Sequence, residues 1–167
     1  MNALLLYRIA RWFYIHKIPF FPKLFKTLNT WLYACKIPYE MPIGKGTKFA
    51  AGGLCLNLNG TSIGTGCRIG TMCVMMRSFP YKRLPQIGNN VYISHGVKFV
   101  GPVIVEDGAM IAANCVVTKS VPQNAIVAGV PGKIIGYTTD LEYNPFENPQ
   151  YKDGHLPYLV DKRQMDK

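Results

Sequence analysis

Apolar residues recur every six positions through the middle of the chain, a spacing that fits neither an α-helix nor a simple strand. The series consists of Ile63, Ile69, Met75, Ile87, Ile93, Phe99, Val105, Ile111 and Val117, with Tyr81 in register between Met75 and Ile87. A small or β-branched residue stands four positions after most of these anchors, and glycine follows the anchor at Gly64, Gly70 and Gly88. Very short strands wound into a solenoid need this combination, because each strand fills a narrow interior with one large side chain and then turns a corner.

The position of the cysteines in this repeat indicates their role. Cys67, Cys73 and Cys115 occupy the small position that faces the interior, so we expect them to be buried thiols without a chemical role. The other two, Cys35 and Cys55, lie before the regular repeats. Five cysteines without C-x-x-C spacing favour neither a disulfide framework nor a zinc site, and we expect no metal site.

Helical spacing replaces the six-residue period in residues 1–40. An apolar stripe with offsets 0, 1, 4, 7, 8 and 11 is formed by Leu24, Phe25, Leu28, Trp31, Leu32 and Cys35. Lys23, Lys26 and Asn29 fall off this stripe. A shorter helix is expected to end before Pro19, and its apolar residues are Leu5, Ile9, Trp12 and Phe13.

Two interpretations of these helices stay open. The favoured one is that their apolar stripes pack against the rest of the protein, because such stripes usually belong to a core. The alternative is a peripheral contact with a membrane surface, since Arg and Lys beside Trp and Phe suit the headgroup region of a bilayer. After the repeats, residues 137–167 are polar and interrupted by Pro145, Pro149 and Pro157, which predicts a C-terminal tail.

Composition limits the fold class further. The chain has 167 residues, of which 49% are apolar and 17% charged, so it can fill the core of one domain and is not a disordered protein. Sixteen glycines and twelve prolines indicate a turn-dense fold rather than a bundle of long helices.

The net charge of +10 is concentrated near the N-terminus. Residues 1–48 carry eight Lys and Arg side chains against Glu40, a net of +7, which leaves +3 for the remainder. Such a surface suits nucleic acid, an anionic lipid or a polyanionic small molecule. Because no nucleic-acid-binding motif accompanies the charge, we expect no nucleic-acid partner.

For the opening of the chain we expect neither a membrane-spanning helix nor a secretory signal. It contains no apolar run of the roughly eighteen residues that a spanning helix requires. Arg8 and Arg11 interrupt the first apolar run, and no small-residue cleavage site follows it. The sequence therefore predicts a cytoplasmic protein. If the alternative interpretation of the helices holds, the protein would lie at the periphery of a membrane.

The segment Ile87–Ile135, IGNNVYISHGVKFVGPVIVEDGAMIAANCVVTKSVPQNAIVAGVPGKII, resembles the hexapeptide-repeat acyltransferases. Its most specific element is the closing V-P-x-N-A-x-V-x-G-V-P-x-K, from Val121 to Lys133. The N-terminal helices and the phrase IPYEMPIGKGTKF resemble the serine acetyltransferase-like proteins of surface-polysaccharide gene clusters. The resemblance implies an all-β solenoid, a left-handed parallel β-helix over residues 41–136, between N-terminal α-helices at 1–40 and the tail at 137–167.

The resemblance also implies a cofactor, acetyl-CoA, bound in a groove between neighbouring subunits of a homotrimer. In this family three hexapeptides make one coil, so that residues eighteen apart stack on adjacent coils. The positions that contact the pantetheine arm correspond to His95, Ala112 and Ala113. Those that contact the phosphate and adenine end correspond to Thr118, Lys119 and Lys133, where a cation compensates the charge of the cofactor.

Transfer of an acyl group to a hydroxyl needs a general base, which in this family is usually a histidine. The family phrase F-x-H-x-G-L-G corresponds to Phe49–Cys55, where Ala51 replaces the histidine. A second family histidine, in R-H-P-x-I-G, is replaced by Leu84. Of the three histidines that the chain has, His95 lies nearest to the expected path of the thioester and is the candidate catalytic base.

The acceptor is expected to be bound by Arg77, Lys82 and Arg83, three cations that suit an anionic sugar derivative. The sequence thus predicts acetyl-CoA-dependent transfer to a hydroxyl, or less readily an amine, of a sugar or polysaccharide precursor. The acceptor attacks directly, without a covalent enzyme intermediate. Because both expected histidines are replaced, the alternative is a catalytically inactive homologue that acts as a scaffold or regulatory subunit.

Overall fold

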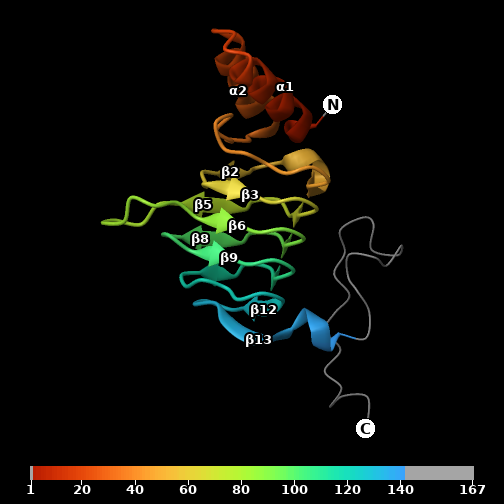
Figure 1. The fold of residues 1–167 in the computed structure, drawn as a ribbon, viewed down its shortest axis with the longest axis vertical. Coiled ribbons are helices and arrows are strands. Elements are labelled where there is room, and N and C mark those ends of the chain that lie inside the picture. Colours follow the sequence, from red (N-terminus) through yellow and green to blue (C-terminus); the bar gives the residue numbers. More distant parts are fainter. Residues whose placement is uncertain (1, 142–167) are drawn as a thin grey trace.

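A computed structural model describes residues 2–141, with two helices at one end of a stack of short strands (Figure 1). Most of the predicted tail, residues 142–167, lies outside the described residues. The strands form three sheets. The six-stranded sheet contains β1 (Lys48–Phe49), β4 (Arg68–Ile69), β7 (Tyr92–Ile93), β10 (Met110–Ile111), β12 (Ala125–Ala128) and β13 (Lys133–Tyr137). The four-stranded sheet contains β2 (Asn57–Leu58), β5 (Val74–Met76), β8 (Lys98–Val100) and β11 (Val116–Val117), and the three-stranded sheet contains β3 (Ser62–Ile63), β6 (Gln86–Ile87) and β9 (Ile104–Val105).

From β1 to β12 the chain visits the three sheets in a fixed cyclic order, so that three strands make one turn of a coil. After β11, Val121 completes the cycle by bridging to Val105 of the three-stranded sheet. All strand pairs are parallel except β12 and β13, which pair antiparallel at the last coil. The predicted stack of coils is therefore present, since parallel pairing between successive turns is what a solenoid requires.

The anchors of the six-residue period fill the interior of the stack. Nine of them have at most 2% of their side-chain surface exposed, namely Ile63, Ile69, Met75, Ile87, Ile93, Phe99, Val105, Ile111 and Val117. They align from coil to coil, as Met75 and Val117 do on either side of Phe99. The prediction from the period is confirmed at these positions.

Tyr81 is the exception, and the sequence-based expectation for it is wrong. The residues between Met76 and Gln86 leave the coil and project from the stack between β5 and β6, and Tyr81 is 57% exposed (Figure 1). Strand partners that enclose this loop are 24 residues apart, as in Ile69 and Ile93, whereas later partners such as Ile93 and Ile111 are 18 apart. The loop thus adds one six-residue unit that keeps the period in the sequence but forms no side of a coil.

Hydrogen bonds between side chains and backbone hold the corners of successive coils together. Asn89 Oδ1 accepts hydrogen bonds from the backbone N–H and the hydroxyl of Thr65, at 2.9 and 3.0 Å. Asp107 in turn accepts hydrogen bonds from the backbone and side-chain N–H groups of Asn89. These hydrogen bonds hold the pKa of the Asp107 carboxyl below its usual range. Because its folded-state pKa is lowered, the stabilisation from Asp107 is present at neutral pH and is lost as acid protonates the carboxyl.

Helix α1 (Ala3–Ile15) packs against the first coil. The side chain of Asn2 caps its N-terminus by accepting a hydrogen bond from the backbone N–H of Leu5 at 2.9 Å. The helix buries Ala3, Leu4, Leu6, Tyr7 and Ala10, and the Tyr7 hydroxyl donates to the backbone carbonyl of Met41. Packing of this helix on the body is confirmed, but the predicted stripe is not the face that packs, since Leu5 and Trp12 are 46 and 52% exposed.

Helix α2 (Phe21–Tyr33) behaves differently, and the expectation that its stripe packs on the body is wrong. Its buried residues are Pro22 and Asn29 alone, whereas Leu24, Leu28, Trp31 and Leu32 are 46, 38, 85 and 52% exposed. The reason is that α2 turns the side that carries Asn29 toward α1, where Asn29 Nδ2 donates a hydrogen bond to the Ala3 carbonyl. This polar side of the helix is therefore covered, and the apolar stripe is not. Neither this helix nor any other among residues 2–141 is long and apolar enough to span a bilayer.

The cysteines allow a direct test of the interior. Cys35, Cys67, Cys73 and Cys115 are buried, and burial raises the pKa of the Cys35 thiol to about 12 and that of Cys73 to about 11. Since the thiolate is the reactive form, these thiols stay inert while the protein is folded.

We expect one thiol per chain, Cys55, to react rapidly with a disulfide reagent at mildly alkaline pH, and five to react in denaturant. Rapid reaction that persists in Cys55→Ser would show that the coils open.

Candidate functional site

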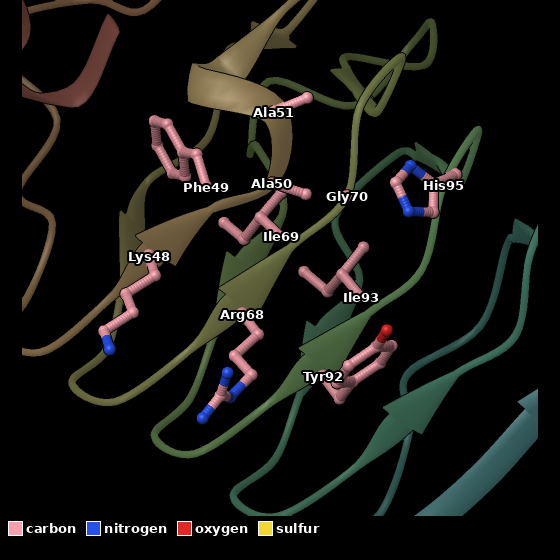
Figure 2. Close-up of a pocket in the computed structure, with 10 residues that line it drawn as sticks. All are labelled: Lys48, Phe49, Ala50, Ala51, Arg68, Ile69, Gly70, Tyr92, Ile93 and His95. Carbon is pink, nitrogen blue, oxygen red and sulfur yellow. The ribbon is translucent and has the colours of Figure 1, made fainter. Parts of the chain in front are cut away.

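A cleft of about 190 Å³ lies on the outer surface of the six-stranded sheet, beside the short 3₁₀ turn η1 (Ala50–Gly53) (Figure 2). It is lined by Lys48, Phe49, Ala50, Ala51, Arg68, Ile69, Gly70, Tyr92, Ile93 and His95. These residues come from the equivalent side of three successive coils, at β1, β4 and β7 and the corners after them. The stacking of the coils therefore builds the cleft from residues about twenty positions apart in the sequence.

One end of the cleft is basic and aromatic. Lys48, Arg68 and Tyr92 are the first residues of β1, β4 and β7, and their side chains lie in a row along this end in Figure 2. Burial raises the pKa of the Tyr92 phenol, which therefore remains protonated at neutral pH and keeps a hydroxyl donor. Two cations and a phenol suit an anionic or carbonyl oxygen.

The other end brings together Ala51, Gly70 and His95 (Figure 2). Ala51 has a φ of 43°, a left-handed conformation imposed by the turn η1. Gly70 has no room for a side chain, because a Cβ atom there would lie 2.6 Å from the backbone nitrogen of His95. The position at which relatives are expected to carry a histidine thus faces the same cleft as the histidine that this chain has.

The hydrogen bonds of His95 define its protonation. Its Nδ1 atom lies 3.1 Å from the backbone N–H of Thr71, which can only donate, and 2.9 Å from the Thr71 hydroxyl. Nδ1 therefore accepts, and a neutral His95 ring carries its proton on Nε2. In this conformation His95 offers a bound substrate a hydrogen-bond donor at Nε2. The imidazole holds Thr71 at a corner of the coils as Asn89 holds Thr65.

The predicted pantetheine contacts lie at adjoining corners. The backbone N–H of Asn114 donates to the carbonyl of His95 at 2.9 Å, so that the corner Ala112–Asn114 stacks on the corner of His95. Ala113 is exposed there and Ala112 is half-buried. The eighteen-residue spacing of His95 and Ala113 is thereby reproduced in space, although neither alanine lines the cleft.

The residues expected at the phosphate and adenine end are all exposed. Thr118 and Lys119 follow β11, and Lys133 begins β13. The neighbouring Gly132 donates its backbone N–H to the carbonyl of Val116 at 2.9 Å, which brings the two segments side by side. These three side chains lie outside the cleft.

The predicted acceptor residues belong to a different surface. Lys82 and Arg83 line an open depression of about 760 Å³ beside the three-stranded sheet, together with Thr61, Tyr81, Leu84, Gln86, Pro102 and Ile104. Arg77 starts the projecting loop and does not line this depression. Leu84, the second expected histidine position, lies here and not in the cleft with Ala51. A single chain thus places the two positions on different surfaces.

Lys48, Arg68 and Tyr92 were not identified from the sequence. Each directly precedes a residue whose side chain packs in or against the core, so alternation along a strand points it outward. The sequence did contain a signal for these residues. The first strand position on this side of three successive coils is occupied by a polar or aromatic residue. Within residues 2–141 there is no group of three His, Cys, Asp or Glu side chains placed to hold a metal ion.

Known proteins resemble this chain in sequence and in fold. Residues 85–119 match the family model described as bacterial transferase hexapeptide (six repeats). A serine acetyltransferase of Synechococcus elongatus is 28% identical over 172 residues, which cover 96% of this chain and 68% of that protein. A serine acetyltransferase of Mycobacterium tuberculosis is 42% identical over 79 residues, which cover 47% of this chain and 32% of that protein.

A solved serine acetyltransferase from Brucella abortus strain S19, in complex with coenzyme A, has a TM-score of 0.74 and 28% identity. The match covers 81% of this chain and 55% of that one, so the chain spans about half the length of this solved relative. The narrower resemblance to proteins of surface-polysaccharide gene clusters finds no support among these relatives. Residues 85–119 are thus similar to the bacterial transferase hexapeptide family, and in sequence and fold the chain is similar to serine acetyltransferases.

Proposed function

We propose that this chain is an acetyl-CoA-dependent acetyltransferase with a hydroxyl acceptor, built on a left-handed parallel β-helix. The observation that carries the proposal is the likeness, at 28% identity and a TM-score of 0.74, to a serine acetyltransferase in complex with coenzyme A. The small residues at the corner of Ala112 and Ala113 leave the backbone accessible to an extended pantetheine arm. Thr118, Lys119 and Lys133 would meet the phosphates and adenine.

The hydroxyl of serine is the first acceptor that we propose, because the similar proteins are named serine acetyltransferases. A hydroxyl attacks the thioester carbonyl, its proton must leave, and CoA departs as the thiol. The donor on His95 Nε2 suits the carbonyl oxygen, on which negative charge develops. With Ala51 in place of a histidine, the cleft lacks a base at the position where the family phrase has one, and we expect slow transfer.

A sugar acceptor is the second candidate, and one observation favours it. The depression lined by Tyr81, Lys82 and Arg83 combines an aromatic ring with two cations, which suit an anionic sugar derivative. Its volume of about 760 Å³ exceeds what the side chain and backbone of one amino acid would fill.

We propose a homotrimer as the active assembly. Ala51 and Leu84 lie on different surfaces of one chain, so a site that uses both positions can form only between two copies. A closed ring of identical contacts between the six-stranded surface of one copy and the three-stranded surface of the next satisfies this requirement.

Calorimetry with coenzyme A tests the proposal. We expect the native chain to bind coenzyme A and Ala113→Trp to lose binding by at least about a hundredfold, because the indole fills the path of the pantetheine. The acceptor is then identified by release of free thiol from acetyl-CoA in the presence of serine or of a panel of nucleotide sugars. Faster release with serine would favour the first candidate, and faster release with a sugar the second.

The matched control is Lys45→Trp, an equally exposed corner of the first coil, which should bind coenzyme A as the native chain does. Light scattering on the same samples should give three times the chain mass of 18.7 kDa. A native chain that binds no coenzyme A contradicts the proposed function, and a monomer contradicts the assembly. Binding without transfer to any acceptor would identify the scaffold or regulatory alternative.

A further inference from the structure

The exposed face of helix α2 has no partner within the described chain. Phe21, Leu24, Leu28, Trp31 and Leu32 repeat at helical spacing, and each is at least 38% exposed. Trp31, at 85%, has almost its whole side chain in solvent. A contiguous apolar stripe of this kind marks an interaction surface rather than a free surface of the protein. We call these five side chains the α2 stripe.

Helix α1 extends the apolar surface of the same helical hairpin. Trp12 and Ile15, near its end, are 52 and 59% exposed, and Phe20 in the connection to α2 is 71% exposed. Phe13 joins the helices by stacking on Phe21 and Phe25, with ring centroids 4.7 and 5.8 Å apart. The hairpin stands at one end of the stack (Figure 1).

The charge of this end is of one sign. Residues 1–39 contain six Lys and Arg and no Asp or Glu. Lys23 and Lys26 lie on the polar side of α2, next to the stripe, and both are exposed. Together with Thr27, Thr30, Trp31 and Tyr39 they line a hollow of about 420 Å³. The hydroxyls of Thr27 and Thr30 donate to backbone carbonyls, so it is the two ammonium groups in this hollow that suit a phosphate group.

We propose that the α1–α2 hairpin binds the surface of an anionic lipid bilayer, with the α2 stripe in the headgroup region and Lys23 and Lys26 on lipid phosphates. Helices that lie in a membrane interface combine aromatic and aliphatic residues on one face with Lys and Arg on the other, as α2 does. The inference is independent of the proposed acetyltransferase activity.

Other occupants fit the observations less well. A second copy of the hairpin would bring two surfaces of the same positive charge together, which opposes association. Nucleic acid would contact the cations and stack on the aromatic rings but would leave Leu24, Leu28 and Leu32 in water. A lipid surface accommodates the cations, the rings and the leucines at once.

Intrinsic fluorescence provides the test, because the two tryptophans of the chain, Trp12 and Trp31, are both in the hairpin. We expect the full chain to co-sediment with mixed phosphatidylcholine–phosphatidylglycerol vesicles and its tryptophan emission to shift to the blue. Partitioning onto phosphatidylcholine alone should be weaker by at least about tenfold, because each Lys near an anionic surface contributes about a fivefold factor.

Two variants separate the apolar and the charged contributions. Leu24→Glu/Leu28→Glu, which keeps both tryptophans, should reduce partitioning by at least about tenfold, because two buried leucines are lost from the interface. Lys23→Glu should reduce it by at least about fivefold. The matched controls are Phe79→Glu, an aromatic side chain 96% exposed on the projecting loop, and Lys45→Glu on the first coil, and both should bind as the native chain does.

Three outcomes would overturn the inference: no binding to anionic vesicles, binding that Leu24→Glu/Leu28→Glu leaves unchanged, or an equal loss in the control variants. Light scattering without lipid distinguishes the remaining occupant. If Leu24→Glu/Leu28→Glu lowers the mass of the native assembly, the α2 stripe is a contact between copies and the lipid proposal is wrong. Circular dichroism of each variant confirms that the helices remain folded.

Discussion

Replacing Ala51 with histidine is expected to raise the rate of acetyl transfer to a hydroxyl by about 10²–10⁴, the contribution of a positioned general base. Ala51 is exposed and lines the cleft together with Gly70 and His95, so an imidazole there has room and faces the proposed path of the thioester. Its φ of 43° favours histidine over most other residues, because histidine tolerates the left-handed region comparatively well. The measurement is the rate of thiol release from acetyl-CoA with serine.

The positional control for this variant is Ala50→His, one residue earlier in the same turn and also in the lining of the cleft. It should gain less than about tenfold, since the side chains of adjacent residues in a turn point in different directions. Equal gains in both variants would mean that any imidazole in the cleft suffices.

His95→Ala in the native and Ala51→His backgrounds identifies what His95 does. Because Nδ1 accepts from Thr71 and Nε2 is a donor, we expect a similar loss in both backgrounds, as for a group that stabilises charge on the carbonyl oxygen. A loss confined to the native background, with a pH profile that loses one ionisation, would show instead that His95 is the native base. No activity in the native chain or in any of the three variants, with coenzyme A still bound, would establish the scaffold alternative.

Replacing Phe99 with alanine is expected to lower the free energy of unfolding by about 3–5 kcal/mol. Phe99 has no exposed surface and lies between Met75 and Val117 on the coils on either side. The interior of one coil is narrow, so neighbouring side chains have little freedom to fill the cavity that the ring leaves. Thermal unfolding should show a fall in Tm of roughly 6–20 °C.

Phe79→Ala is the matched control, because it removes the same ring from a position that is 96% exposed on the projecting loop. Its Tm should stay close to that of the native protein. A similar Tm for Phe99→Ala and the native chain would contradict the view that the stacked anchors hold the coils together.

The six-residue period was sufficient to predict the interior of the stack, because inward and outward positions of a very short strand differ sharply in the side chains they accept. The three core cysteines and Phe99 followed from their place in the period, and all are buried. Tyr81 shows the limit of this reasoning. A looped-out unit of six residues leaves the period of the sequence intact, so periodicity cannot distinguish it from a unit that forms one side of a coil.

For the candidate site, the sequence predicted the stacking of His95 and Ala113 but neither the cleft nor its basic end. Lys48, Arg68 and Tyr92 are separated by 20 and 24 residues, and the register of the coils alone makes them neighbours. The hydrogen bonds that fix the proton of His95 on Nε2 come from Thr71, a residue 24 positions away. Such contacts depend on the offset between coils, which no local pattern specifies.

What the sequence determined by itself was a stack of short strands with an apolar interior, two helices and a basic N-terminal end. Those features depend on the period of apolar residues and on charge, and both can be read along the chain. The tertiary structure decided which face of each helix is covered. Helix α1 packs with the face of Leu4 and Tyr7 and not with the expected stripe, which includes Trp12. Helix α2 turns a polar edge toward α1 and leaves Leu24 and Trp31 in solvent. The spacing of apolar residues did not reveal this, because burial depends on the neighbour that a helix meets and not on the helix alone.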